Sequence, residues 1–380
     1  MNKNFTHKCI ILIASTLLIT ACQSSTQSLT QSISDATEKK PPFTLPNSNE
    51  TIGSIEIYQG EALQLLDKNA QVSVRGSGFS WAEGPVWVDD GSYLLFSDIP
   101  KNLIRKFSVE HGNEIYLENT GFIEPSNKGP GSNGLLINQD NQLVLLQTGE
   151  RQVSLMQAPL NKPEARFTTL VNNYQGMRLN GTNDGVFDRQ GNLYFTDPVI
   201  GLDVIFETNN TSQEKKLIEK HYKKPLTREK RVQQTPFAGV YRLSVDGKLT
   251  LVDDTLTVPN GIALSPDDKT LYISVSDKSA SAWFAYDVQE NGSLTNKREF
   301  FNAQHLIGQP EQQGLPDGMA VHSSGVVFAT GPGGVWLFDP EGKVLAKIKT
   351  GLATSNCTFT SDEKTLFITA DDYLLSVPIK

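Results

Sequence analysis

Cysteine and histidine are scarce in this chain of 380 residues, which holds three of the first and five of the second. Three cysteines cannot all pair with one another, so a disulfide framework is excluded as the main source of stability. The histidines are His7, His111, His221, His305 and His322. None of them stands in the paired spacing that is typical of zinc proteins, so the sequence does not support a zinc site.

Positive charge and helical patterning are also in short supply. Lysine and arginine total 34 against 42 aspartate and glutamate, which gives a formal net charge of −8. Because nucleic-acid phosphates attract clustered basic side chains, we expect no nucleic-acid partner for this mildly acidic chain. Residues 52–380 carry no sustained apolar period of 3.6 residues, which argues against an alternating βαβ architecture.

A hydrophobic run long enough to cross a bilayer comfortably is missing too, although a shorter one stands near the N-terminus. Two lysines precede an apolar run over residues 9–21, a layout typical of a secretory signal peptide. Residues 19–22 read Ile-Thr-Ala-Cys and resemble a bacterial lipobox. We therefore expect a signal peptide over residues 1–21 and a lipid on Cys22, with an ordinary signal peptide cleaved nearby as the alternative.

Residues 22–50 are rich in serine, threonine and glutamine and predict a lipidated flexible tether. The expected location is the bacterial cell envelope, with a lipid anchor. Gln23 follows the cysteine where an aspartate would retain the protein, so the periplasmic face of the outer membrane is favoured over the inner membrane. Cys9 would leave with the signal peptide, and Cys357 would remain as a buried, unreactive thiol.

One pattern, a turn signal followed by an alternating apolar strand, occurs six times in the rest of the chain. Its copies occupy residues 91–98, 141–148, 191–198, 268–275, 324–331 and 363–370. Most copies lie about 40–50 residues apart, which is the length of one four-stranded propeller blade. The sequence therefore predicts an all-β, six-bladed β-propeller over residues 51–380. We expect residues 52–58 to supply the strand that closes the last blade onto the first, because closure removes an open sheet edge.

A longer interval separates the third copy from the fourth and indicates an insertion at about residues 203–236. This segment is rich in lysine, arginine and glutamate and contains a candidate short helix over residues 212–222. It is either a solvated surface excursion or a basic lid beside the channel that would favour an anionic substrate.

Oxygen-bearing side chains precede four of the repeated strands at an equivalent position, in short motifs with glycine. They are Glu83, Asn183, Asn260 and Asp317. A single Asn-Gly or Asp-Gly is usually only a turn former, but the same position in four blades can face one axis. Two carboxylates and two amide oxygens form a hard donor set of charge −2, which suits Ca²⁺ and can also hold Mg²⁺ or Mn²⁺. We therefore expect a divalent metal site in the central channel.

A series of motifs spans about residues 80–380 in order. They are AEGPVW (82–87), GSNGLL (131–136), YQGMRLNGTNDGVFD (174–188), YFTDPVIGL (194–202), VPNGIALSPDDKTLYIS (258–274), LPDGMAVHSSG (315–325), ATGPGGVWLFDP (329–340) and TSNCTFTSDEKTLFITA (354–370). In these motifs the chain resembles the gluconolactonase/regucalcin-like (senescence marker protein-like) family of six-bladed propeller hydrolases. The resemblance implies that the four oxygen-bearing residues are metal ligands, that Arg178 contacts polar substrate groups and that Asn133 orients the substrate.

Each of these further assignments has a plainer structural alternative. Arg178 could pair with a nearby carboxylate at the surface, and Asn133 could serve only in a turn. Asp184 and Asp197 are expected either to orient the ligands through hydrogen bonds or to cap strand ends. The chain departs from the family pattern at residues 147–148, where many relatives carry a histidine, so a mechanism with that histidine as the base is in doubt.

The resemblance implies the hydrolysis of a small sugar-type lactone by a metal-associated water. Asp317 is the candidate catalytic carboxylate that accepts the proton of this water. Asp184 or Asp197 is the alternative, because metal ligation lowers the basicity of Asp317. A phosphotriesterase or arylesterase of the same fold, and a non-catalytic binding propeller with structural Ca²⁺, are the other hypotheses.

A quinone-dependent sugar dehydrogenase is disfavoured, because the inner motifs lack the histidine and aromatic pattern of its cofactor site. The expected partners are a small lactone and, through the lipid anchor, a membrane. The sequence indicates no obligatory protein partner.

Overall fold

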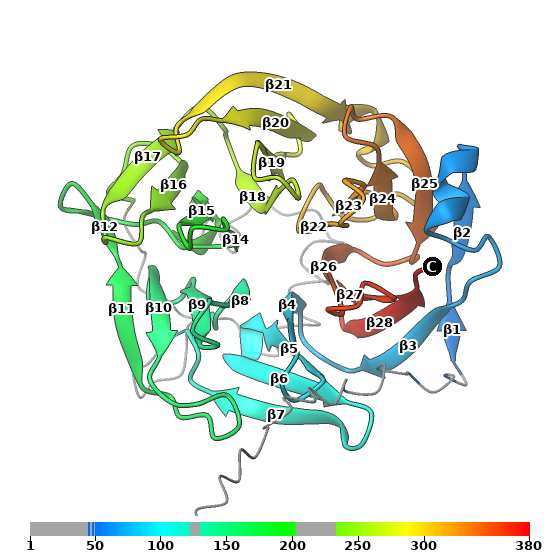
Figure 1. The fold of residues 1–380 in the computed structure, drawn as a ribbon, viewed down its shortest axis with the longest axis horizontal. Helices are drawn as coiled ribbons and strands as arrows, with labels where there is room; N and C mark the ends of the chain where they lie inside the picture. The colour runs from blue at the N-terminus through cyan, green and yellow to red at the C-terminus, as the bar shows by residue number, and fades with distance from the viewer. Residues whose placement is uncertain (1–44, 46–47, 49, 122–129, 203–232) are drawn as a thin grey trace, which may run out of the picture. The chain divides into compact units, whose positions relative to one another are not determined.

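Each copy of the repeated strand becomes the second strand of an antiparallel sheet, and six such sheets surround a central axis (Figure 1). The computed structural model describes residues 45, 48, 50–121, 130–202 and 233–380. The predicted signal peptide, Cys22, most of the predicted tether and most of the predicted insertion lie outside the described residues. Within the described residues, no helix has the length and apolar character that a membrane crossing requires.

Blades one to three follow one another along the chain, each running from the axis outward. Blade one contains β4 (Ala82–Val88), β5 (Tyr93–Asp98), β6 (Leu103–Ser108) and β7 (Gly112–Glu118). Blade two contains β8 (Leu135–Ile137), β9 (Leu143–Gln147), β10 (Gln152–Met156) and β11 (Phe167–Val171). Blade three contains β14 (Gly185–Phe187), β15 (Leu193–Asp197), β16 (Gly239–Leu243) and β17 (Leu249–Asp253). Between blades two and three, β12 (Asn173–Tyr174) pairs with β13 (Met177–Arg178).

Blades four to six complete the ring, and the last two recruit strands from the start of the described chain. Blade four contains β18 (Pro259–Leu264), β19 (Thr270–Val275), β20 (Ala282–Val288) and β21 (Leu294–Asn302). Blade five contains β22 (Met319–Val321), β23 (Val327–Gly331), β24 (Gly334–Phe338), β25 (Val344–Lys349) and β2 (Ser54–Ile57). Blade six contains β26 (Thr354–Phe359), β27 (Thr365–Ala370), β28 (Tyr373–Pro378), β3 (Val72–Ser77) and β1 (Thr51–Ile52). The helices of the described residues are short 3₁₀ turns at Gly60–Gln64, Ile99–Lys101, Val199–Leu202 and Gln304–Leu306.

The ring is closed by β3, which pairs with β28 of the last blade. The expectation that residues 52–58 form the closing strand is therefore wrong for most of that segment. Its main part, β2, instead adds a fifth strand to blade five, where Ser54 lies opposite Lys349. The chain changes from one blade to the other at Gly53, whose φ of +67° and close approach to the backbone of Lys349 leave no room for a side chain.

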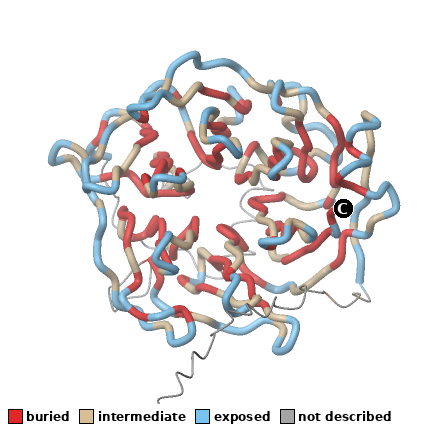
Figure 2. Tube along the Cα trace, in the orientation of Figure 1, coloured by how far each residue is buried: buried red, intermediate tan, exposed pale blue. Residues whose placement is uncertain are grey.

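Six clusters of buried apolar side chains hold the ring together, one between each pair of neighbouring blades. Leu94 and Phe96 of β5 pack with Phe367 of blade six, whereas Leu95 packs with Leu135 of blade two. Because both faces of the second strand are buried, its sequence is a short continuous apolar run. Figure 2 shows the result, with buried residues on the inner strands and exposed ones on the outer rim.

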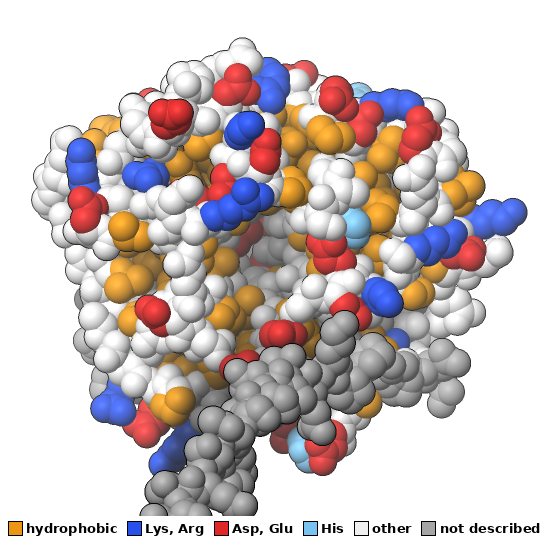
Figure 3. Space-filling model, viewed as in Figure 1, with side chains coloured by type: hydrophobic (Ala, Val, Ile, Leu, Met, Phe, Trp, Pro, Cys, Tyr) orange, Lys and Arg blue, Asp and Glu red, His pale blue; other side chains and the backbone are white. Residues whose placement is uncertain are grey.

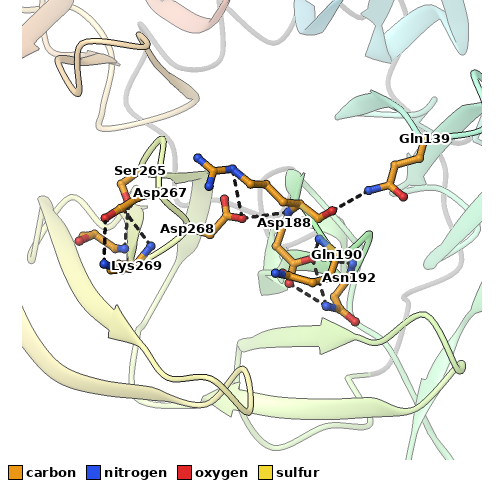
Figure 4. Close-up of polar contacts among 10 residues, drawn as sticks. Gln139, Asp188, Gln190, Asn192, Ser265, Asp267, Asp268 and Lys269 are labelled. Carbon is orange, nitrogen blue, oxygen red and sulfur yellow. Dashed lines mark hydrogen bonds and ion pairs between the residues drawn. The ribbon is translucent and has the colours of Figure 1, made fainter.

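Polar contacts also join neighbouring blades at the hairpin turns that connect the first and second strands of a blade (Figure 4). The turn over residues 188–192 of blade three accepts a hydrogen bond from Gln139 of blade two, whose Nε2 lies 2.9 Å from the carbonyl oxygen of Arg189. The backbone N–H of Arg189 donates to Asp268 of blade four at 3.0 Å. Within the turn, the Asp188 carboxylate accepts backbone N–H groups. These ties fix the spacing of three consecutive blades.

Candidate functional site

Each predicted oxygen ligand stands where the innermost strand of a blade begins, and a β-bulge marks this position. In blade three, the N–H of Asn183 donates to the carbonyl of Thr196, and the N–H of Thr196 donates to the carbonyl of Asp184, both at 2.9 Å. Asn183 and Asp184 thus lie opposite the single residue Thr196. In blade five, Asp317 and Gly318 lie opposite Thr330 in the same way. Register shifts mark the same place in β4 and β18. A bulge re-aims side chains next to a functional site, which the regular alternation of a strand would not do.

Glycine recurs in these motifs because neighbouring blades approach each other closely there. Gly84 has a φ of +52°, and a Cβ atom on it would lie 2.1 Å from the carbonyl oxygen of Asn133 in blade two. A Cβ atom on Gly261 would lie 2.2 Å from the carbonyl oxygen of Asp317 in blade five. The glycines are therefore contact points between blades rather than hairpin turns. They bring side chains of different blades within reach of one another.

A hydroxyl group at each blade junction holds the start of an inner strand in place. The donor–acceptor pairs of this hydroxyl belt are Ser97–Asn133, Thr148–Thr182, Thr196–Asn260, Ser276–Pro316, Thr330–Ser355 and Ser355–Ala82, where each acceptor is a backbone carbonyl. Buried carbonyl groups need such partners, and here the donor always comes from the neighbouring blade. The belt therefore couples the starts of all six inner strands, four of which carry the candidate ligands.

Two of the carboxylates at this end of the channel come from blades one and three. Glu83 on β4 is 3% exposed, and Asp184 ahead of β14 is 8% exposed. Burial and the nearby charge of Asp184 raise the pKa of Glu83 to about 8, and burial raises the pKa of Asp184 to about 6. Nδ2 of Asn356 in blade six lies 3.3 Å from Oε2 of Glu83 and 3.4 Å from Oδ2 of Asp184. The ionised forms of both acids are thus disfavoured by their surroundings, and a cation would reverse that preference.

Asp317 brings a third carboxyl group to the same place from blade five. Burial raises the pKa of Asp317 well above its ordinary range, and the charges of Glu83 and Asp184 raise it further. Its Oδ1 atom is buried without a hydrogen-bond partner among the described residues. The side chain of Asn260 donates to the Asp317 carboxyl group and also lies 2.9 Å from Oγ of Ser276. With its amino group engaged in this way, Asn260 keeps its carbonyl oxygen as an acceptor for a ligand.

This donor set fits a hard divalent cation. Carboxylates that repel one another, together with a buried carboxylate oxygen that lacks a partner, are features that bound Ca²⁺, Mg²⁺ or Mn²⁺ would satisfy. No three acidic, histidine or cysteine side chains of the described residues form a metal site by themselves, so amide oxygens would have to complete the donor set. The space-filling view shows that the surface is hollowed at the centre of the ring (Figure 3).

Asn183 and Asn133 stand just before the inner strands of blades three and two, and each is 7% exposed. The carbonyl of Asn133, ahead of the inner strand of blade two, accepts the hydroxyl of Ser97 at 2.7 Å. The N–H of Gly134 donates to the carbonyl of Asn183 at 2.8 Å, which joins the inner strands of blades two and three. Asn133 therefore occupies a position equivalent to that of the candidate ligands rather than a hairpin turn. Its role with a substrate stays a prediction.

Asp197 caps a loop of blade three. Its carboxylate accepts the backbone N–H of Asn180 at 2.8 Å and that of Gly181 at 2.7 Å. Burial raises the pKa of Asp197 to about 7 in spite of these two donors. The capped loop leads directly to Asn183, so Asp197 acts on the candidate ligand through the backbone.

Arg178 lies on β13, outside the blades, and its side chain is exposed. Its Nη2 atom donates to the carbonyl of Glu150 at 2.8 Å and lies 3.8 Å from Oε2 of the same residue. The backbone N–H of Arg178 donates to Oε1 of Gln234 at 2.7 Å. This surface pairing is the arrangement that the sequence left open as the alternative. Substrate binding by Arg178 stays a prediction.

The segment where the expected histidine is missing supports the loops of blade two. Nε2 of Gln147 donates to the carbonyl of Thr120 at 2.7 Å, and its Oε1 accepts Nε2 of Gln152 at 2.7 Å. The next residue, Thr148, belongs to the hydroxyl belt. These side chains are buried structural partners, and neither of them is a group that titrates near neutral pH.

Asn356 is the residue of this site that the sequence pattern did not identify. It lies near the start of β26, the inner strand of blade six, at a register shift like those that mark the candidate ligands in other blades. The Thr-Ser-Asn-Cys motif is a signal for it, but Asn356 is followed by Cys357 rather than by the glycine that drew attention to the other motifs.

Residues 81–372 match the SMP-30/gluconolactonase/LRE-like family. A gluconolactonase of Zymomonas mobilis is 34% identical over 339 residues, which cover 88% of this chain and 88% of the relative. The chain belongs to this family. Among solved members of the SMP-30/gluconolactonase family, a gluconolactonase from Xanthomonas campestris superposes with a TM-score of 0.70 at 26% identity, over 89% of this chain and all of the other.

A relative with a different name also aligns over most of the chain. The diisopropyl-fluorophosphatase of Loligo vulgaris is 24% identical over 301 residues, which cover 76% of this chain and 85% of the relative. The relatives of this chain are thus named for two different activities, gluconolactonase and diisopropyl-fluorophosphatase.

Proposed function

We propose that this protein is a lactonase that opens a small sugar-type lactone with the help of a divalent cation, with Ca²⁺ as the first candidate. The main support is the meeting of Glu83, Asp317 and Asn260 around a buried carboxylate oxygen that lacks a partner among the described residues. The 34% identity to a gluconolactonase supports the substrate class. When bound, the cation would polarise the lactone carbonyl group. Mg²⁺ and Mn²⁺ are further candidates, because the same oxygen donors accept them.

Asp317 is the proposed base. Its Oδ1 atom carries no hydrogen bond from the described residues, so it can accept the proton of an attacking water. A bound cation would lower the basicity of Asp317, and the burial of its side chain opposes that effect by raising its pKa. Asp184 is less suited to this role, because the N–H of Gly185 occupies its Oδ1 at 2.9 Å and Nδ2 of Asn356 faces its Oδ2.

Asn133 and Arg178 are the proposed contacts to the hydroxyl groups of the sugar. Asn133 places a nearly buried amide just before the inner strand of blade two, and Arg178 carries a guanidinium group that its contact with Glu150 leaves half exposed. A few polar groups of this kind are enough to fix the orientation of a small ligand. The reaction needs the lactone carbonyl beside Asp317, with the ring hydroxyl groups turned toward these two side chains.

The test is a panel of an aldonolactone, a phosphotriester and an arylester, with acid release followed by a pH indicator and the uncatalysed rate subtracted. We expect the highest kcat/KM on the lactone. Glu83→Gln should lower that value about 100-fold or more, because the variant removes a ligand charge. Glu110→Gln, on an exposed turn of blade one, is the matched control and should match the wild type. Unchanged lactone hydrolysis by Glu83→Gln would overturn the proposal.

The same panel separates the other hypotheses. The resemblance to the Loligo diisopropyl-fluorophosphatase favours a phosphotriester substrate as the second candidate, since the same donors can face a phosphoryl oxygen. A higher kcat/KM on the phosphotriester than on the lactone would establish that candidate instead. A binding propeller with structural Ca²⁺ would bind the ion but hydrolyse none of the three compounds.

A further inference from the structure

The side chain of Asn356 crosses from blade six to two acidic residues that lie on different blades. It is 6% exposed, and its Nδ2 atom is 3.3 Å from Oε2 of Glu83 in blade one and 3.4 Å from Oδ2 of Asp184 in blade three. These long, paired distances describe an amino group shared between two carboxylates. An amino group has two hydrogens, so it can serve both acceptors at once.

A backbone contact fixes which end of the amide faces the acids. The N–H of Cys357 donates to Oδ1 of Asn356 at 2.8 Å. This bond assigns the oxygen end of the amide to the backbone and the amino end to Glu83 and Asp184. A flipped amide would lose that bond and would place its oxygen against two carboxylates.

The engaged oxygens also indicate which one stays available to a ligand. Oε2 of Glu83 accepts the N–H of Gly84 at 2.6 Å in addition to the amino group of Asn356. Because two donors hold Oε2, Oε1 is the oxygen of Glu83 that we assign to the cation. Asp184 has donors on both oxygens, so it serves as a fixed negative charge beside the site.

Space for this side chain is provided by Gly318, the residue after Asp317. A Cβ atom on Gly318 would lie 1.9 Å from Cγ, 2.1 Å from Oδ1 and 2.3 Å from Nδ2 of Asn356. The three nearest atoms thus all belong to one side chain, and φ of Gly318 is not among the positive values. The glycine at this position therefore makes room for Asn356, and an alanine would displace that side chain while the backbone conformation stays allowed.

We propose that Asn356 is a positioning residue that aligns Glu83 and Asp184 for cation binding, and that Gly318 makes this alignment possible. The inference rests on the proposed function, because it concerns the same cation site. Asn356 itself supplies no proton and touches no reacting atom. It acts by holding the carboxylates of Glu83 and Asp184 in one arrangement, although their like charges repel each other.

A double-mutant cycle tests the proposal, with Ca²⁺ affinity measured by calorimetry on protein freed of metal. Asn356→Ala should weaken Ca²⁺ binding about 10- to 100-fold, the usual cost of losing a partner of a metal ligand. Gly318→Ala should weaken it to a similar extent. The double variant should equal Asn356→Ala alone, since the added methyl group then meets no amide. Gly60→Ala, which has no atom within 4 Å of the new methyl group, is the control and should leave the affinity unchanged.

Kinetics at saturating Ca²⁺ provide the second measurement. For a positioning role we expect kcat to return to within about threefold of the wild type once the site is filled, while the Ca²⁺ concentration for half-maximal activity stays raised. Asn356→Ser replaces the alanine variant if the latter does not fold, as judged by circular dichroism, and should show the same loss of affinity.

The outcomes separate this inference from the proposed function. Wild-type protein that binds Ca²⁺, beside an Asn356→Ala variant whose affinity stays within twofold, would overturn the role of Asn356 and leave the lactonase proposal standing. Additive effects of the two substitutions would overturn the role of Gly318. Wild-type protein that binds none of Ca²⁺, Mg²⁺ and Mn²⁺ would overturn both proposals.

Discussion

The hydroxyl belt predicts that removing one buried hydroxyl will loosen two blades at once, and Thr330→Val is the sharpest case. Thr330 is fully buried on β23. Its Oγ1 atom lies 2.8 Å from the carbonyl oxygen of Gly318 and 2.8 Å from that of Ser355. Valine has nearly the same shape but no donor. The change therefore removes a hydrogen shared by two carbonyls, one next to Asp317 and the other next to Asn356.

The loss of stability in Thr330→Val depends on the hydrogen bonds that the two carbonyl groups keep. Each carbonyl keeps one backbone donor, because the N–H of Thr330 bonds to Gly318 and the N–H of Gly318 bonds to Ser355. The variant therefore loses one hydroxyl donor, and both carbonyl groups stay partly satisfied. The expected cost is about 1–2 kcal/mol of unfolding free energy. For a domain that spans residues 51–380, that loss corresponds to about 1.5–3 °C in Tm. Cation affinity should fall as well, since both flanking residues lose their tether.

Denaturant unfolding and thermal melts of the metal-free protein measure the loss, and calorimetry measures the affinity for Ca²⁺. Thr330→Ser keeps the hydroxyl and should recover at least half of the difference. Thr250→Val, at an exposed position of β17, is the matched control and should change stability by less than about 0.5 kcal/mol. A Thr330→Val variant as stable as this control would refute the belt as a source of stability.

Three further substitutions probe the glycine contact between blades, the buried Asp197 and the surface residue Arg178. Gly84→Ala should cost at least about 2 kcal/mol of unfolding free energy, because it combines a left-handed φ with a clash against Asn133. Gly247→Ala, the control, has a left-handed φ without a clash and should cost about half as much. Asp197→Asn tests the raised pKa of about 7: the folded wild type binds the extra proton, so the stability that this group contributes is complete below about pH 4 and is lost as the pH rises through 7. The Tm of the wild type relative to Asp197→Asn should therefore fall between pH 5 and pH 8, and a constant difference would contradict the burial argument. Arg178→Ala should leave Tm unchanged and raise the KM for a lactone about tenfold (~1.4 kcal/mol), whereas an unchanged KM would leave Arg178 as a surface pairing only.

The number of blades was predictable because the second strand of each blade is buried on both faces. That burial imposes the apolar runs around Leu94 and Leu366, and the spacing of such runs identifies the propeller. The closing strand was harder to place, because the outermost strand of a blade is exposed on one side and its pattern is weak. Val72–Ser77 and Ser54–Ile57 alternate alike, and the contact of Gly53 with the backbone of Lys349 decides which of them joins which blade.

The place of the four candidate ligands at the start of the inner strands was predictable for a reason other than the turn propensity of glycine, while their role as ligands stays a prediction. Gly84 and Gly261 recur because two blades meet there, and the same contact places Glu83 beside the acids of other blades. Asn356 has no glycine after it, so the rule that found the others passed over it. Asn356 and Glu83 are in contact although they lie far apart in the sequence, and a single sequence does not indicate such a pairing.

Removal and return of the cation show whether lactone hydrolysis depends on the proposed site. Protein treated with a chelator until elemental analysis finds no Ca²⁺, Mg²⁺ or Mn²⁺ should lose nearly all hydrolysis of an aldonolactone above the uncatalysed rate. Addition of Ca²⁺ should restore the activity along the same curve as its binding to the site of Glu83, Asn183, Asn260 and Asp317. Full lactone hydrolysis by the metal-free protein would rule out a cation-dependent mechanism.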